Sequence, residues 1–124
     1  LHQLVQTDAV AYNGLMDAYK IPKHHPDRHQ AILIALQRAT EVPLEITELS
    51  CEAARLLYAL REGAKPAIHS DLTVGLTLAI AAAKAGLVTA NTNINAQQNH
   101  KLIDSIRLRI VQATESLEEL RVLC

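Results

Sequence analysis

The sequence predicts an all-α protein, an antiparallel bundle of long helices formed by residues 1–124 as a single domain. Hydrophobic residues make up 49% of the chain, yet Phe and Trp are absent, so the core must be built from Leu, Ile, Val and Ala. Apolar residues recur at intervals of three and four, which is the helical period, rather than two. The apolar stripes are long enough to pair two copies, so we also expect a dimer.

The first helix is expected from Leu1 to about Lys20. Asp8 occupies an apolar position of its stripe, where a carboxylate is costly unless it is paired or hydrogen-bonded. Asp8 therefore either faces a cation or the edge of the bundle, or is held in a cleft for proton transfer or ligand binding. The full stripe, with spacings of four and three, is Leu1, Val5, Asp8, Tyr12, Leu15 and Tyr19.

The prolines of "KIPKHHPDRH" end the first helix, and a second is expected from Pro26 to about Ala39. Pro43 leaves two alternatives for the next segment, which ends near Glu62. Either Thr40 caps a new helix that starts near Pro43, or one long helix kinks there.

A fourth helix is expected after Ser70, and small apolar residues occupy nearly every side of it. We therefore expect this helix to be central, with neighbours packed around it. Ser70 is its predicted N-cap and Asp71 lies in its first turn. The run from Leu72 to Ala90 is long enough to span a bilayer, but Lys84 and many alanines favour a buried helix of a soluble protein.

The last helix, from His100 to Leu123, has a regular apolar seam with charged residues, Arg109 among them, outside it. The seam residues are Ile103, Ile106, Ile110, Ala113, Leu117 and Leu120.

Composition excludes several classes of function. The net charge of −1 argues against a nucleic-acid partner. Cys51 and Cys124 make no disulfide framework, which is typical of a reduced, cytoplasmic protein with Cys51 as a small buried residue. No P-loop, dinucleotide fingerprint or metal motif is present. His25 and His29 could share a helix face as zinc ligands, but solvated loop histidines are the stronger interpretation.

The fourth helix ends in "TANTNIN", a cluster of side-chain amides. Asn91 and Asn95 are four apart and share one face, where they offer donors and acceptors suited to a flat heterocycle such as a pterin. The alternative is a helix end that frays into a polar loop. Asn93 lies on another face and is expected to meet solvent or cap the helix.

Three segments, in order and spacing, resemble the cyclodeaminase/cyclohydrolase family. That family comprises the cyclodeaminase domain of formiminotransferase–cyclodeaminase and bacterial methenyltetrahydrofolate cyclohydrolases. "TDAVAYNGLMDAYKIPK" resembles its Asp-x-x-Ala-Tyr/Phe…Ala-Tyr-x-x-Pro-Lys segment, and "RATEVPLEI" its Ala-x-x-Val-Pro-Leu turn. "HSDLTVGLTLAIAAAKAGLVTANTNIN" resembles its Ser-Asp…Asn-Val-x-x-Asn helix, with Gly75 and Thr92 in place of the usual Ala and Val.

The resemblance implies a helical homodimer with a folate cleft among helices near the subunit interface. The reaction would open or close a one-carbon bridge between folate N5 and N10, with a tetrahydrofolate derivative as substrate and no metal or redox cofactor. Matched position by position, it implies Asp8, Lys23 and Asp71 as catalytic residues. It implies substrate binding by Tyr19, Ser70, Asn91 and Asn95.

The resemblance also leaves an alternative open. Family members carry an upstream helix that begins with a Pro-Gly-Gly-Gly-Ser run, which this sequence does not contain. We therefore keep the expectation that the chain is N-terminally incomplete, and beside the enzyme a second hypothesis: a non-catalytic helical dimerisation module derived from the family.

Overall fold

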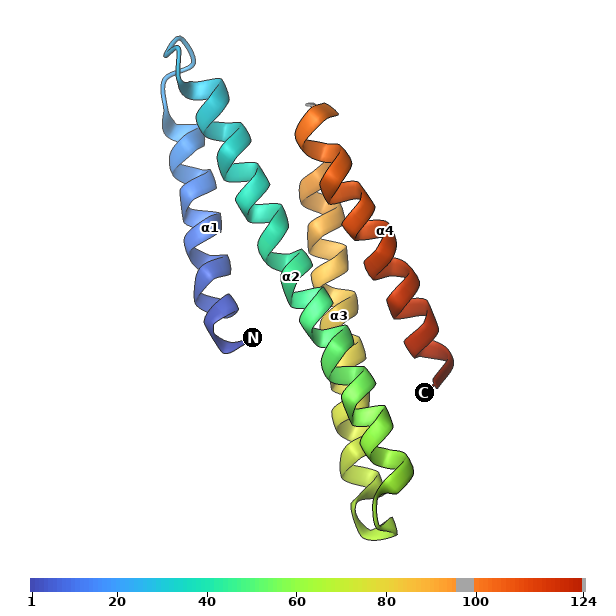
Figure 1. The fold of residues 1–124 in the computed structure, drawn as a ribbon. Helices are drawn as coiled ribbons and strands as arrows, with labels where there is room; N and C mark the ends of the chain where they lie inside the picture. The colour runs from blue at the N-terminus through green and yellow to red at the C-terminus, as the bar shows by residue number, and fades with distance from the viewer. Residues whose placement is uncertain (96–99, 124) are drawn as a thin grey trace.

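The computed structural model describes residues 1–95 and 100–123, and the side chains of residues 100–103 lie outside that description. Within these ranges the chain forms four α-helices and no strand, so the all-α prediction is confirmed (Figure 1). The elements are α1 (His2–Lys20), α2 (Arg28–Gly63), the short 3₁₀ helix η1 (Pro66–Ile68), α3 (His69–Asn95) and α4 (His100–Leu123).

The long antiparallel pair of α2 and α3 forms the spine of the molecule. Helix α1 packs on the first half of α2, and α4 packs on both α2 and α3. Figure 1 shows α1 and α4 on either side of α2. Among the described residues, the backbone of α1 comes close to α2 but not to α3 or α4. The face of α3 that points away from α2 and α4 is therefore exposed.

The main core lies between α2, α3 and α4, and the predicted seam of α4 supplies one side of it. Ile106, Ile110, Ala113, Leu117 and Leu120 are all buried, which confirms the seam over that range, while Ile103 lies outside the described side chains. Facing residues of the spine include Leu44, Leu76, Ala83 and Ala90.

Of the predicted stripe of α1, Leu15 is buried, but most of the other members lie off the face that packs. Helix α1 turns Ala11, Leu15 and Ala18 toward α2, whereas Val5 is 68% exposed and Tyr12 59% exposed. Two alanines let the helix backbones approach closely, which favours this face over the one with larger side chains. The other exposed members of the predicted stripe are Leu1 and Tyr19.

Helix α2 continues through Pro43, so the alternative with a single long helix is the one that the structure adopts. Thr40 does not cap a new helix. It is buried, and its hydroxyl donates to the Leu36 carbonyl at 2.8 Å. Because Pro43 has no N–H, the Ala39 carbonyl lacks its usual helical donor.

Asn93 supplies that missing donor. Its side-chain amide donates to the Ala39 carbonyl at 2.8 Å, across the α2–α3 contact. The expectation that Asn93 meets solvent or caps the helix is therefore wrong, because a buried carbonyl without a donor is costly. One amide of the cluster at the end of α3 thus joins two helices.

Helix α3 is less central than predicted. It buries one face, with Leu76, Ala83 and Ala90, and leaves the opposite face exposed. With η1 it forms a segment, Pro66–Asn95, that is long and apolar enough to cross a membrane by length and composition, and only 22% of its most apolar window is buried. Ser70 is the second residue of α3 rather than its N-cap, because the η1 turn leads directly into His69.

Candidate functional site

Asp8 lies at an open cleft between α1, α2 and α3. The cleft has a volume of about 300 Å³, and Asp8 is its one charged lining residue. The side chain is half-buried, and no hydrogen bond or ion pair joins its carboxylate to another described residue. Such a carboxylate is free to receive a ligand donor or cation. The other lining residues are Pro43, Ile46, Ala82, Ala85, Gly86 and Thr89.

At the floor of this cleft α2 and α3 come into close contact at Gly86. A Cβ at Gly86 would lie 2.5 Å from Thr47 Oγ1 and 2.6 Å from the Pro43 carbonyl oxygen, so only glycine fits there. The Thr47 hydroxyl lies 3.1 Å from the carbonyl oxygens of both Pro43 and Ala83 and can donate to either. These contacts fix the positions of α2 and α3, two of the helices that line the cleft, relative to each other.

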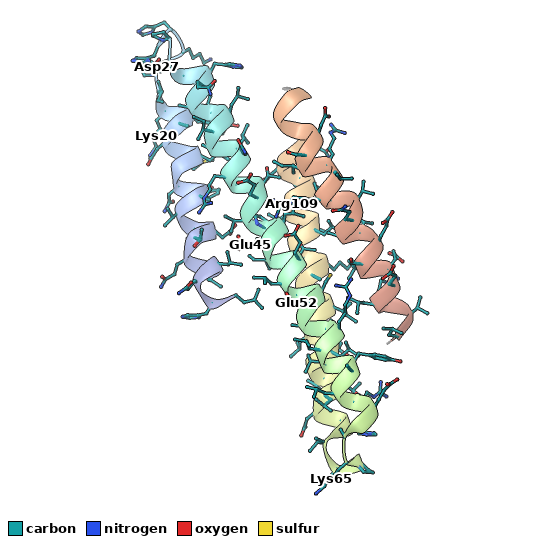
Figure 2. The ribbon with its side chains drawn as sticks, viewed as in Figure 1. Lys20, Asp27, Glu45, Glu52, Lys65 and Arg109 are labelled. Atoms are coloured by element: carbon teal, nitrogen blue, oxygen red, sulfur yellow. The ribbon has the colours of Figure 1, made fainter. Side chains whose placement is uncertain are left out.

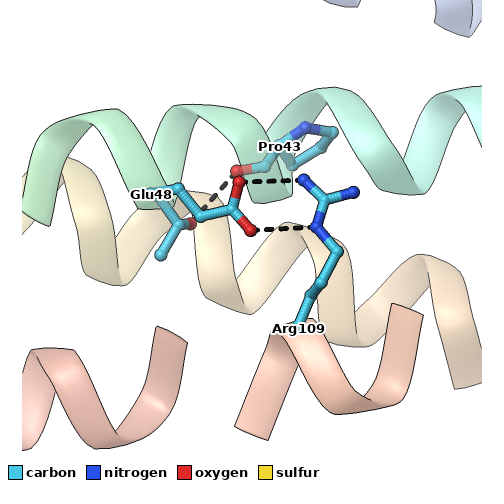
Figure 3. A network of polar contacts seen from close by, with 4 residues as sticks. Pro43, Glu48 and Arg109 are labelled. Carbon is cyan, nitrogen blue, oxygen red and sulfur yellow. Dashed lines mark hydrogen bonds and ion pairs between the residues drawn. The ribbon is translucent and has the colours of Figure 1, made fainter. Parts of the chain in front are cut away.

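An ion pair joins α4 to α2 next to this contact between α2 and α3. Arg109 donates to both carboxylate oxygens of Glu48, at 2.9 and 2.8 Å (Figure 3). This hydrogen bonding raises the pKa of Arg109 further above its ordinary value. Arg109 is outside the apolar seam, as predicted, but nothing in the sequence identifies Glu48 as its partner, 61 positions away.

Cys51 lies buried next to that pair, which confirms the prediction of a small buried residue. It lines a cavity of about 150 Å³ together with Glu48, Arg55 and Arg109. Burial raises the pKa of the Cys51 thiol. Since the thiolate is the reactive form, Cys51 is a poor nucleophile at neutral pH.

Tyr19 and Lys23 lie at the far end of α1, where the chain turns into α2. Both are exposed, and the structure gives their side chains no contact with Asp8. Arg28 holds this turn by donating to the carbonyls of Ile21 at 2.9 Å and Tyr19 at 3.5 Å. Figure 2 shows the turn between the labelled Lys20 and Asp27, at one extremity of the molecule.

The predicted polar residues of α3 lie at its two opposite ends. Ser70 and Asp71 are exposed in its first turn, whereas Asn91 is half-buried and Asn95 exposed in its last turns. Twenty residues separate Asp71 from Asn91, which corresponds to about 30 Å along the helix. One chain therefore cannot bring Asp71 and the asparagines to the same ligand.

Of the predicted site residues, only Asp8 lines this cleft. The cleft spans the α3 turns from Ala82 to Thr89, whereas Asn91, two residues further on, lies roughly 200° around the helix from Thr89 and so on the opposite face of α3. A larger groove of about 870 Å³ lies between α1 and α2, and none of the predicted site residues lines it. Sequence reasoning gave no signal for this groove, whose lining includes Val10, Ile34 and Arg38.

The histidines of the α1–α2 turn do not gather into a metal cluster within the described ranges. His25 instead lies against its own loop: its Nδ1 accepts a hydrogen bond from the Asp27 backbone N–H at 3.2 Å. His29 is exposed on the first turn of α2.

Comparison with curated proteins finds no match. A family model described as formiminotransferase-cyclodeaminase matches residues 1–112. That range contains α1, α2, α3 and the first half of α4, and thus every residue of the Asp8 cleft. The chain belongs to the formiminotransferase-cyclodeaminase family.

Proposed function

We propose that the chain acts on a one-carbon adduct of tetrahydrofolate, as a methenyltetrahydrofolate cyclohydrolase or a formiminotetrahydrofolate cyclodeaminase. Family membership supports the substrate class. The observation that carries a catalytic role is the unpaired, half-buried carboxylate of Asp8 in a cleft that is otherwise apolar or weakly polar. The protein would work in the cytoplasm on this small molecule, with no nucleic-acid or membrane partner.

The two reactions need similar chemistry. In the hydrolase, water adds to the methenyl carbon, and its bond to N5 or N10 then breaks. In the deaminase, N10 attacks the formimino carbon and ammonia leaves. Both pass through a cationic amidine and require proton transfer, without a metal or redox step. The Asp8 carboxylate can offset the amidinium charge and accept a proton from the attacking water or nitrogen.

The size of the cleft indicates how the substrate would lie. A volume of about 300 Å³ is at the small end for a ligand pocket. It suits the flat pterin and the reacting nitrogens, so the remainder of the folate would extend along the molecule. Asn91 does not line the cleft, so a role for Asn91 and Asn95 in hydrogen-bonding the heterocycle is supported by their match to the family's asparagine motif alone. Lys23 and Tyr19, on the solvent-exposed turn, would meet the glutamate tail.

Replacement of Asp8 tests the proposal. Asp8→Asn keeps the shape and removes the charge, so we expect turnover of methenyl- or formimino-tetrahydrofolate to fall by about 10²–10⁴-fold. Asp17→Asn is the matched control, because Asp17 is an exposed carboxylate on the same helix that only pairs with Lys20 at 3.6 Å. Equal activities of the two variants would remove Asp8 from the mechanism.

The second candidate is a non-catalytic dimerisation module. It is favoured by the separation of Asp71 from Asn91 within one chain, which leaves the family-matched residues dispersed. A chain that folds and dimerises but binds no folate would support this candidate over the enzyme.

A further inference from the structure

The Asp8 cleft contains one polar side chain besides Asp8, and it comes from a different helix. Thr89 lines the cleft from α3, whereas Asp8 lines it from α1. The remaining lining residues have hydrocarbon side chains or, at Gly86, none. Thr89 is not among the residues that the family motifs imply. A polar group that enters the cleft can therefore meet only these two polar side chains there.

Thr89 offers this cleft a hydrogen-bond acceptor. Its hydroxyl donates to the Ala85 carbonyl at 3.2 Å, within α3. A hydroxyl has one proton and two lone pairs, so while this bond holds, Thr89 Oγ1 has only lone pairs left for a ligand. A carboxylate is likewise an acceptor only, and that of Asp8 has no partner among the described residues.

The backbone around the cleft adds no donor. All of its lining residues lie inside α1, α2 or α3, where each backbone N–H donates to the carbonyl four residues earlier. Pro43 has no N–H at all. The cleft thus presents acceptors and apolar surface, so a ligand that fits must bring its own donors, and a positive charge to meet Asp8.

We propose that this cleft is a binding site for a planar cation with N–H donors, an amidinium or guanidinium group, held by Asp8 and Thr89. Such a group carries N–H bonds on more than one nitrogen in one plane, so it can donate to a carboxylate and to a second acceptor at once. Pro43, Ile46 and Ala82 would receive the hydrocarbon part of the ligand. The volume of about 300 Å³ suits one ring with its cationic group.

For the two candidate reactions, this inference rests on the proposed function and separates their substrates. The formimino group has N–H on its terminal nitrogen, and the neighbouring N10 has another. The methenyl bridge is also a cationic amidine, but its N5 and N10 carry no hydrogen. Asp8 attracts both substrates by charge, whereas Thr89 can accept a hydrogen bond only from the formimino adduct. Thr89 is therefore a specificity-determining residue that favours the deaminase substrate.

The cation site is tested without folate, by NMR titration with benzamidinium. We expect saturable binding by the parent chain, about tenfold or more weaker binding by Asp8→Asn, and about threefold or more weaker binding by Thr89→Val. Thr89→Ser keeps the hydroxyl and should bind as the parent does. Thr114→Val is the matched control, since the Thr114 hydroxyl makes the same kind of bond on α4, to the Ile110 carbonyl at 2.7 Å. No binding by the folded parent, or binding that neither Asp8→Asn nor Thr89→Val weakens, would overturn the site.

A second pair of probes separates hydrogen bonding from charge. Formamidinium and tetramethylformamidinium are both planar cations, but the methylated one has no N–H. Its methyl groups also favour an apolar cleft, so weaker binding can be attributed to the lost donors. We expect it to bind the parent about tenfold or more weakly than formamidinium does. Equal or tighter binding of the methylated cation would overturn the selection for N–H donors.

Turnover tests the role of Thr89 in substrate choice. Thr89→Val should lower kcat/KM for formimino-tetrahydrofolate by about tenfold, mainly through KM, and that for methenyl-tetrahydrofolate by less than about twofold. Thr89→Ser should restore the parent values. Equal losses for the two substrates, or no loss for either, would overturn the specificity role. A parent that binds benzamidinium at Asp8 but turns over neither folate would overturn the folate function and leave the cation site standing.

Discussion

Gly86 decides how closely the two longest helices approach. Its missing Cβ leaves room for Thr47 Oγ1 and the Pro43 carbonyl, and the resulting contact forms the floor of the Asp8 cleft. The sequence shows Gly86 only as one small residue in an apolar helix. Its role cannot be deduced from the pattern, because that role depends on which residues of α2 lie opposite.

Substitution of Gly86 should therefore be costly despite the better helix propensity of alanine. We expect Gly86→Ala to lower the free energy of unfolding by about 1–3 kcal/mol, because the new methyl group forces α2 and α3 apart. Gly14→Ala is the control, since nothing lies within 4 Å of its Cβ position, and it should stabilise the chain by about 0.5–1 kcal/mol. Urea unfolding measures both; a loss of stability no larger for Gly86→Ala than for Gly14→Ala would refute the close contact.

Cys51 gives a pH-dependent prediction at the same scale. Burial raises its pKa above the ordinary value of 9.0, so the folded state favours the neutral thiol. The stability that this thiol contributes is fully present below pH 9.0 and is lost as the pH rises through the raised folded value. The difference in unfolding free energy between the parent and Cys51→Ala should therefore shrink in alkaline urea titrations. A difference that stays constant would show that the thiol ionises as easily when folded.

At the scale of the element, the helices of this protein could be predicted well, but not the faces they bury. The seam of α4 was found from its spacing because its apolar residues are large and its other faces are charged. The spacing failed for α1, where alanines compete with larger residues as the packing face. Helix α3 was predicted to be covered on nearly every side, because its small apolar residues do not single out one face, yet it buries only one. The sequence also could not decide whether the helix breaks or continues at Pro43, because the outcome depends on Asn93, 50 residues further along the chain.

The Asn93–Ala39 hydrogen bond links α2 to α3 at the proline. Asn93→Ala should cost about 1–3 kcal/mol of unfolding free energy, because the Ala39 carbonyl loses its donor. In a Pro43→Ala background, residue 43 has an N–H that can donate to that carbonyl, so the same change should cost about 1 kcal/mol less. A double-mutant cycle measures this coupling, and strictly additive effects would contradict it.

At the scale of the whole molecule, the sequence predicted the all-α class and the family, and the family model confirms the second. It also predicted seven site residues, but the positions of these residues within the fold do not follow from motif matching. Only Asp8 lines a described cleft, and Asp71 lies at the opposite end of α3 from the asparagines. Motifs indicate which residues act together in a family, whereas the length of α3 decides how far apart Asp71 and the asparagines lie in one chain.

The central claim is that this chain binds a reduced folate at the Asp8 cleft, and calorimetric titration with 5-formyltetrahydrofolate tests it most directly. We expect saturable binding of one folate per chain by the parent and by Asp17→Asn, and a loss of affinity of at least about tenfold in Asp8→Asn. A folded parent chain that gives no binding heat, or an Asp8→Asn variant that binds as tightly as the parent, would contradict the account.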